Sequence, residues 1–297
     1  MKHSTKTILA AIDNSEASRS VFKETLVLAS TLRARVVIVA VTPNYEGNMN
    51  RFCIEDAQKK FDEPFQKILK EAFDYANSLG LSLKTVHRKG KPSDEILEVA
   101  LEESVSLIVL GGKRKLQFER MLLGRILAEI VTNSSCDVLV IPEGSEIRFS
   151  NILVDVAESE QGIIGEIRAF DIAESYGSQV HGLYSVDIPA ERSLRYGVAR
   201  EAEEKATAAL EAFSSRAELR GISVINSMDY NIPEHCLANY AKARHMDLIV
   251  LGVRTEQAFI EIFGGSTIER LVSISSCPIL AVKNGERQGR ASVAAIF

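Results

Sequence analysis

Short continuous runs of apolar residues alternate along the chain with longer segments in which apolar residues recur every three or four positions. A continuous run predicts a strand buried on both faces, and the longer period predicts a helix. Their alternation predicts βαβ units with right-handed crossovers, and hence a parallel sheet. In the first half we expect strands at 7–12, 35–41, 81–86, 107–110 and 138–141.

Helix signals separate these strands. Ser15 is a suitable N-cap for the first helix, because its hydroxyl can accept a hydrogen bond from an unpaired N–H of the first turn. A long helix is expected at 51–79, where Pro64 predicts a late start or a kink. A turn at 90–93 introduces the third helix, and the last is expected at 124–133.

The same order of elements returns after residue 150. The offset between the copies is 145 from Val41 to Val186 (186 − 41) and 141 from Gly111 to Gly252 (252 − 111). Self-similarity of this kind indicates an internal duplication. The expected fold class is therefore α/β, with two doubly wound five-stranded parallel-sheet domains. The second copy has strands at 151–156, 180–186, 222–228, 248–251 and from 279, and helices at 160–176, 190–219 and 233–244.

The domain limits follow from the repeat and from one linker signal, the Pro-Glu-Gly-Ser sequence at 142–145. We expect a first domain at 1–144, a linker at 145–149 and a second domain at 150–284. The tail at 285–297 has no counterpart in the first half.

The net charge and the lengths of the apolar runs limit which classes of partner the protein can bind. The net charge of −5 argues against nucleic acid as a bulk partner, because binders of the phosphate backbone need a basic surface, although it leaves local basic patches open. No apolar run approaches the roughly 20 residues that cross a bilayer, and the N-terminal residues do not form a signal peptide. From the sequence we expect a cytoplasmic protein with no membrane or nucleic-acid partner.

Motifs for metal, redox and hydrolytic chemistry are missing from the sequence. The four cysteines include no C-x-x-C pair, and the histidines are isolated. Cys136 and Cys277 occupy equivalent places before a strand, and we interpret both as small buried residues rather than reactive thiols. Neither a G-x-S-x-G elbow nor a P-loop is present. We therefore expect no metal site and no catalytic residues.

Two strand-loop-helix turns are the candidate functional sites. The run at 247–252 ends at Gly252, and a later Gly-Ser-Thr at 265–267 precedes a helical pattern. The first half repeats the spacing, since 265 − 252 and 124 − 111 are both 13. Such a turn leaves N–H groups of the helix start unpaired, where an anion such as phosphate can bind.

These residues resemble the universal stress protein family in its tandem form, over residues 6–144 and 150–284. The first strand and its acidic, Ser-containing turn match that family, and so does the pattern of Gly, two residues, Gly, nine residues, Gly, then Ser or Thr. Both copies of this pattern are incomplete. The matching positions are Gly111, Arg114, Gly124 and Arg125 in the first half, and Gly252, Thr255, Gly265, Ser266 and Thr267 in the second.

The resemblance implies ATP or a related nucleotide, with or without magnesium, bound at the carboxyl ends of the strands. The first-strand acid is Asp13; its counterpart is Ala157, with Asp155 displaced by two positions onto the same face. The backbone near Val41 or Val186 would contact the adenine edge. The intact Gly-Ser-Thr favours nucleotide binding in the second half, whereas the basic charge of the first loop favours phosphate binding in the first half.

Arg125 is expected at the start of its helix, where a cation is unfavourable unless an anion is bound. An arginine that extends into water accounts for the same residue equally well.

Three functions remain open at this stage. The first is a regulatory protein that binds nucleotide without fast chemistry, in which Asp13 and Asp155 are the candidate bases for slow ATP hydrolysis or autophosphorylation. The second is a scaffold or binding module whose nucleotide sites have decayed and which takes another small ligand or a protein partner. The third, an adenylating or ATP-splitting enzyme, lacks that class's phosphate motifs after the first strand.

The last strand of each half is an equivalent sheet edge. The resemblance implies pairing through this strand, and we expect the strands at 138–141 and 279–282 to pair within one chain. A homodimer of such chains remains an open possibility.

Overall fold

The computed structural model describes residues 6–43, 57–112, 117–186, 198–253 and 267–284. The chain forms two compact units, one ending at Gly111 and the other beginning at Gly112. Each is an α/β unit built on a mostly parallel sheet, which confirms the expected α/β fold class. None of the helices in the described ranges has the length and apolarity needed to cross a membrane.

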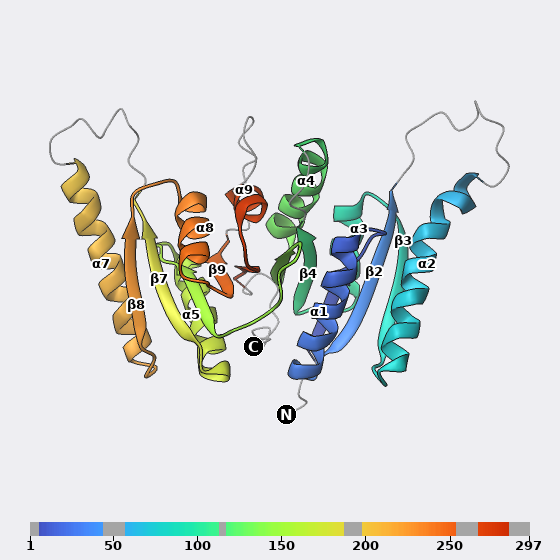
Figure 1. Cartoon of the computed structure of the whole chain (residues 1–297), viewed down its shortest axis with the longest axis horizontal. Helices are drawn as coiled ribbons and strands as arrows, with labels where there is room; N and C mark the ends of the chain where they lie inside the picture. Colours follow the sequence, from blue (N-terminus) through green and yellow to red (C-terminus); the bar gives the residue numbers. More distant parts are fainter. Residues whose placement is uncertain (1–5, 44–56, 113–116, 187–197, 254–266, 285–297) are drawn as a thin grey trace. The chain divides into compact units, whose positions relative to one another are not determined.

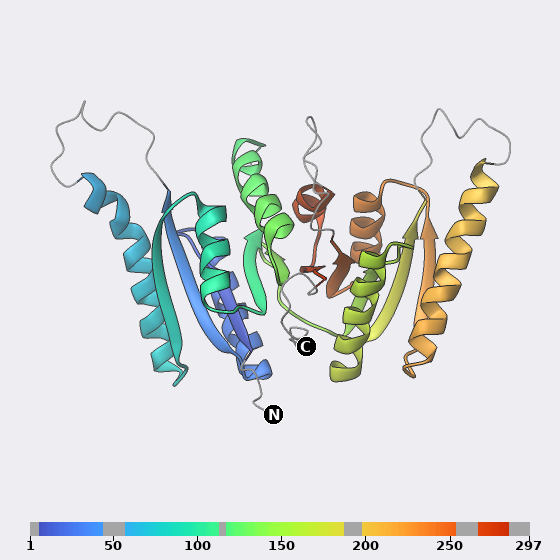
Figure 2. The same cartoon turned by 180° about the vertical axis from the view of Figure 1, so that it is seen from behind.

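The first unit has four parallel strands in the order β3-β2-β1-β4. Helices α1 and α2 lie on one face, where Phe22 and Tyr75 make an edge-to-face contact with ring centroids 5.9 Å apart. Helix α3 covers the other face (Figures 1 and 2). The elements are β1 (Thr7–Ala11), α1 (Glu16–Leu32), β2 (Arg35–Pro43), α2 (Ala57–Ser78), β3 (Leu83–Gly90), α3 (Pro92–Glu102) and β4 (Leu107–Gly112).

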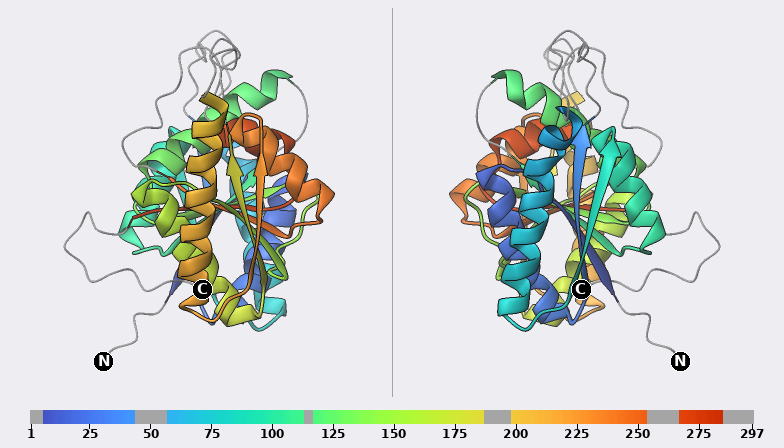
Figure 3. Two further views of the ribbon diagram at one scale, coloured as in Figure 1. Left: turned by 90° about the vertical axis from the view of Figure 1, so that its left-hand side faces the viewer. Right: turned by 90° about the vertical axis from the view of Figure 1, so that its right-hand side faces the viewer.

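The second unit has six strands in the order β5-β10-β9-β6-β7-β8. Helices α5 and α7 share one face, where Phe170 stacks on Phe213 at a centroid distance of 5.3 Å. Figure 3 shows α7 and α8 on opposite sides of the strands. The elements are α4 (Gln117–Asn133), β5 (Asp137–Pro142), β6 (Asn151–Asp155), α5 (Glu160–Tyr176), β7 (Gln179–Ser185), α7 (Val198–Glu218), β8 (Val224–Asp229), α8 (Pro233–Ala243), β9 (Leu248–Gly252), α9 (Thr267–Ile274) and β10 (Ile279–Val282).

Strands β5 and β10 pair antiparallel, with Leu139 opposite Leu280. This is the pairing within one chain that the sequence predicts. It places α4 and β5, which belong to the first sequence repeat, in the second compact unit. The limit between the compact units therefore differs from the limit between the repeats, because β5 joins the sheet of the second repeat.

The two repeats use the same capping chemistry. Ser15 caps α1 by accepting from the N–H of Ser18, as expected, and Ser159 caps α5 by accepting from the N–H of Gly162. The helices end differently. Left-handed backbone is supplied by Gly177 (φ 69°) after α5, but by Arg33 (φ 51°) after α1.

Cys136 and Cys277, two of the three buried cysteines among the described residues, also repeat a local bond. Ser134 Oγ donates to Cys136 O at 2.7 Å, and Ser275 Oγ donates to Cys277 O at 2.8 Å. Each of the two is 5% exposed, and neither forms a disulfide within the described residues. Their packing in the core fits the interpretation of both as small buried residues.

Replacing Arg33 with glycine tests the strain at the end of α1. Arg33→Gly should stabilise the protein by about 1 kcal/mol, because glycine adopts left-handed backbone without the steric cost that a Cβ brings. The reverse control, Gly177→Ala, should destabilise by a similar amount. Urea unfolding of both variants measures the change, and an unaltered midpoint for Arg33→Gly would contradict the assignment of strain.

Candidate functional site

Three predicted residues of the second repeat lie at one edge of the sheet. Asp155 ends β6, Val186 follows β7, and Gly252 ends β9. These strands are parallel, so their carboxyl ends meet at the edge where ligands of open α/β sheets bind. Thr267 is the first residue of α9. Thr255, Gly265 and Ser266 lie outside the described residues.

Asp155 is the chemically unusual group of this edge. The residue retains some solvent exposure, but protein atoms enclose its carboxyl group. Burial raises the pKa of Asp155 to about 7, and no charge or hydrogen bond from the described residues offsets this effect. Lys205 of α7 pairs with Glu158, with 2.9 Å between Nζ and Oε2. Near neutral pH the carboxyl group can therefore be neutral or ionised.

Backbone groups near Val186 are partly engaged. The Val186 N–H donates to the carbonyl of Asp229 at 2.8 Å. A base edge that approached Val186 would meet its carbonyl oxygen as an acceptor, which suits an exocyclic amine donor better than a ring acceptor. The sequence identified Val186 as a candidate but did not show that its N–H is already hydrogen-bonded.

Gly252 has a packing role that the sequence did not show. A Cβ at Gly252 would lie 1.7 Å from the carbonyl oxygen of Gln161 in α5. A Cβ at Gly165 would lie 2.7 Å from the Gly252 backbone nitrogen. The first turns of α5 thus approach the end of β9 backbone to backbone. Glycine is required here whether or not a ligand binds.

The turn after the first strand differs between the two repeats at two paired positions, Asp13 with Ser18 in the first and Ala157 with Gly162 in the second. In the first repeat, Asp13 Oδ1 accepts from Ser18 Oγ at 2.6 Å and from the Ser15 N–H at 2.9 Å. In the second, Ala157 takes the place of Asp13 and Gly162 that of Ser18, since 162 − 18 and 157 − 13 are both 144. A Cβ at Gly162 would lie 2.6 Å from the Ala157 carbonyl oxygen. The second repeat therefore has close packing of Gly162 on Ala157 where the first has a hydrogen-bonded turn.

Val41 lies inside β2 rather than at its end. The strand continues to Pro43, and Val41 is opposite Arg88 in the ladder with β3. The residue is 7% exposed. The end of the second strand, where the base edge was expected, is therefore two residues further on.

The expected position of Arg125 at a helix start is wrong. Helix α4 begins at Gln117, so Gly124 and Arg125 lie within it, and the guanidinium of Arg125 pairs with Glu129 at 3.2 Å. The good helix formers at 121–123 extend the helix upstream of the glycine. Gly124 and Arg125 thus have no place at a helix N-terminus, and the first repeat lacks the anion-binding turn inferred there. Gly111 lies in β4 next to Gly112, and Arg114 is outside the described residues.

The model of the universal stress protein family matches residues 4–142 and again residues 148–283. The chain belongs to the universal stress protein family.

Relatives of this tandem universal stress protein match either part of the chain or nearly all of it. Universal stress protein MJ0531 of Methanocaldococcus jannaschii is 25% identical over 146 residues, which cover 47% of this chain and 85% of that protein. Universal stress protein YxiE of Bacillus subtilis is 29% identical over 143 residues, covering 45% and 97%. The crystal structure of a universal stress protein from Archaeoglobus fulgidus has the same fold, with a TM-score of 0.72, 17% identity and coverage of 94% and 97%.

Sequence reasoning missed the glycines of α5 in this tandem universal stress protein. Gly162 lies in the first turn of α5 and Gly165 in its interior, where glycine costs about 1 kcal/mol relative to alanine. Such a cost usually indicates a close approach, so the Gly-x-x-Gly spacing was a usable signal. Tyr184, which lies near enough to Asp155 to be influenced by its charge, left no signal in the sequence.

Substitution of Asp155 should alter how the stability of this universal stress protein depends on pH. A carboxyl group whose folded pKa is raised stabilises the fold when protonated, and this contribution is lost as pH rises from about 4 through 7. Asp155→Asn should remove that loss and stabilise the protein at pH 8 by an amount on the order of 1–4 kcal/mol. Melting temperatures from pH 4 to 8 measure the effect.

The matched control is Asp74→Asn, at an exposed aspartate of α2. It should leave the shape of the pH profile unchanged. If Asp155→Asn gave a profile parallel to that of the wild type, Asp155 would be ionised and solvated throughout this range.

Gly252→Ala tests packing separately from ligand binding. The added methyl group has no room beside Gln161, so the variant should lose about 1–3 kcal/mol of stability even without ligand. Chemical denaturation of purified protein measures the loss. A variant as stable as the wild type would show that α5 does not approach β9 as closely as described.

Proposed function

We propose that this tandem universal stress protein binds ATP or a related nucleotide in its second repeat and acts as a regulatory protein without fast chemistry. One observation carries the proposal. Gly265 and Ser266 directly precede Thr267, which opens α9 after the carboxyl end of β9. A helix start preceded by glycine and hydroxyl residues suits a phosphate, since its N–H groups are unpaired.

The surrounding residues support the second repeat rather than the first. Helix α9 begins at the expected place, whereas α4 begins upstream of Gly124. Val186 and Asp155 lie at the same edge of the sheet as Gly252. The proposal therefore assigns the adenine to the region beside Val186 and the phosphates to the start of α9.

Asp155 determines how a triphosphate would be accommodated. An ionised carboxylate repels phosphate oxygens, so binding requires either its protonated form or a divalent cation between the two. Asp155 ends β6 at this edge and retains some solvent exposure, so its carboxylate would be a ligand of a magnesium ion held jointly with phosphate. Magnesium would supply charge neutralisation there. Slow hydrolysis or autophosphorylation would be a side reaction of this site, and a cytoplasmic location belongs to the same proposal.

Nucleotide binding can be measured by its effect on thermal unfolding. Saturation at 100 times Kd stabilises a protein by about 2.7 kcal/mol, which corresponds to a shift of several degrees. ATP with magnesium should give this shift in the wild type, and a Gly265→Val/Ser266→Ala variant should lose it. Nucleotide released by heating the purified protein provides a second measurement.

The matched control lies in the first repeat at Gly124, the counterpart of Gly265 (265 − 141). Because Gly124 is inside α4, Gly124→Ala should leave the shift produced by ATP unchanged. The absence of both released nucleotide and a melting shift would overturn the proposal.

A second candidate function is a binding module of the same fold that takes another small ligand or a protein partner. The packing role of Gly252 and the turn formed by Asp13 favour it, because both explain residues of the family pattern without any ligand. If the protein is such a binding module, the Gly265→Val/Ser266→Ala variant should keep its cellular function.

A further inference from the structure

An ion pair joins the first turns of α8 and α9 in the second repeat. Glu234, in the first turn of α8, places its Oε1 2.5 Å from the Nε of Arg270 in α9. The Glu234 side chain is 2% exposed, whereas that of Arg270 is 39% exposed. The carboxylate is therefore enclosed by the protein, and the guanidinium that neutralises it reaches the surface.

Both helices start at the edge of the sheet that carries the candidate site. Helix α8 follows the carboxyl end of β8, which is parallel to β7. Helix α9 ends four residues before β10, so its last turn lies near the amino end of that strand. Because β10 is parallel to β9, the start of α9 is directed to the carboxyl edge, where Gly252 lies. The two helices pack against each other (Figure 1).

Arg270 lies within one turn of the start of α9. It follows Thr267 by three residues, which is about 4.5 Å along the helix axis. Helix α9 also buries Ile268, Leu271 and Val272, but apolar contacts are non-directional. An ion pair at 2.5 Å tolerates little displacement, since the attraction between charges falls with distance. The pair therefore holds the first turn of α9 against α8.

The first repeat lacks the residues for this ion pair. The counterparts of Glu234 and Arg270 are Ser93 and Glu129, since 234 − 93 and 270 − 129 are both 141. Glu129 pairs instead with Arg125 of its own helix. The last helix of the first repeat is also the one that begins upstream of its motif glycine. The ion pair thus accompanies the helix start that directly follows Gly-Ser.

The charges of the pair largely cancel at the start of α9. A cation in the first turns of a helix opposes the helix dipole, and Glu234 offsets the charge of Arg270 there. The pair thus adds little net charge with which to attract an anion. Its effect on an anion bound at this helix start is a matter of position.

We propose that Glu234 and Arg270 are positioning residues: their ion pair holds the start of α9 where its N–H groups meet the phosphates of a bound nucleotide. The inference rests on the proposed function, because it concerns the same helix start. Contacts that fix a site before the ligand arrives reduce the ordering that binding requires. Neither residue touches the nucleotide in this assignment.

The variants Glu234→Gln and Arg270→Gln test this role, because each breaks the ion pair. The dissociation constant for ATP with magnesium, measured by calorimetric titration well below the melting temperature, should rise about tenfold in each. The double variant should bind no more weakly than either single variant, because the two substitutions remove one shared interaction. It also provides a folded test if Arg270→Gln, which leaves Glu234 without its cation, fails to fold.

The effect of Glu234→Gln distinguishes positioning from direct contact. If Arg270 bound the phosphates itself, its release from Glu234 would leave the affinity unchanged or raise it, while Arg270→Gln would lower it. That pattern would overturn the proposal. Arg270→Lys keeps the cation beside Glu234, so its dissociation constant should lie closer to that of the wild type than the value for Arg270→Gln does.

A matched ion pair on the other face of the sheet controls for a merely structural role. Glu166 of α5 is 0% exposed, and its Oε2 lies 2.6 Å from Nη2 of Arg216 in α7. Like Glu234, it is an enclosed carboxylate that joins two helices through a partly exposed arginine. Glu166→Gln should leave the dissociation constant for ATP within about twofold of the wild type, whatever its melting temperature.

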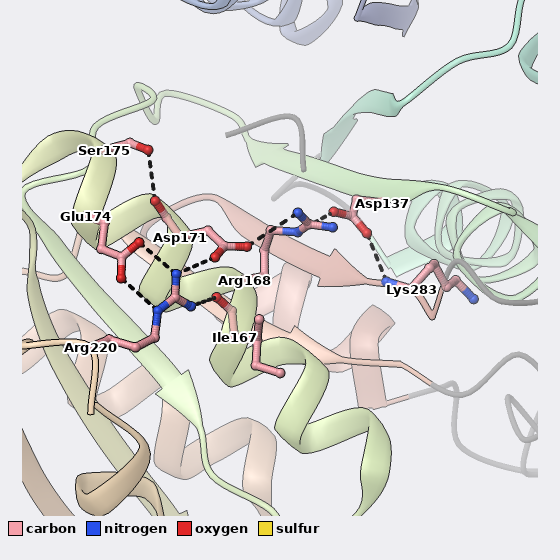
Figure 4. A network of polar contacts seen from close by, with 8 residues as sticks. All are labelled: Asp137, Ile167, Arg168, Asp171, Glu174, Ser175, Arg220 and Lys283. Carbon is pink, nitrogen blue, oxygen red and sulfur yellow. Dashed lines mark hydrogen bonds and ion pairs between the residues drawn. The ribbon is translucent and has the colours of Figure 1, made fainter. Parts of the chain in front are cut away.

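Arg220 is the matched control for the arginine of the pair. It follows α7 and pairs with Asp171 and Glu174 of α5, at 2.7 Å in each case. Figure 4 shows this network, which continues from Asp171 through Arg168 to Asp137. Arg220→Gln breaks these ion pairs and should likewise leave the dissociation constant within about twofold of the wild type.

Two further results would contradict the inference while the proposed function stands. One is ATP binding by the wild type with an unchanged dissociation constant in Glu234→Gln and Arg270→Gln. The other is weakening of the same size in Glu166→Gln and Arg220→Gln. A wild type that binds no ATP would instead overturn the proposed function and this inference together.

Discussion

The pairing of β5 with β10 removes from water two strands made almost wholly of aliphatic side chains. Residues 138–141 and 279–282 are all at most 1% exposed. Left unpaired, either strand would offer a row of free backbone groups flanked by apolar side chains, which favours aggregation. The antiparallel ladder satisfies both strands at once, and it explains why β5 belongs to the second compact unit although its sequence belongs to the first repeat.

The parallel order of the remaining strands fixes the candidate site. Because β6, β7 and β9 run in the same direction, Asp155, Val186 and Gly252 reach one edge from separate parts of the sequence. Helix α5 packs against this edge through glycines, which places its N-terminal turns directly beside the ends of β6 and β9. The same glycines thus allow the backbones of α5 and β9 to approach each other closely.

Periodicity and capping made much of the fold predictable. The apolar runs located the strands, and Ser15 was recognised as a cap because the bond it makes is local. The start of α4 was misplaced because a glycine that resembles a family motif was given more weight than the helix formers before it.

Contacts between distant residues left no pattern in the sequence. Gly252 meets Gln161, and Asp137 meets Arg168 and Lys283, only because the fold brings them together. The enclosure of Asp155 likewise depends on the elements packed around β6, not on its neighbours in the chain.

The limit between the compact units at Gly111 and Gly112 has a consequence for how such a chain can evolve. The duplication produced two sequence repeats of similar length, but the folded parts hold four and six strands. Deleting the second repeat would strip β5 of its neighbour, and deleting the first would strip β10 of its own. Neither half can be discarded without exposing the last strand of the other, which favours retention of both copies in one chain.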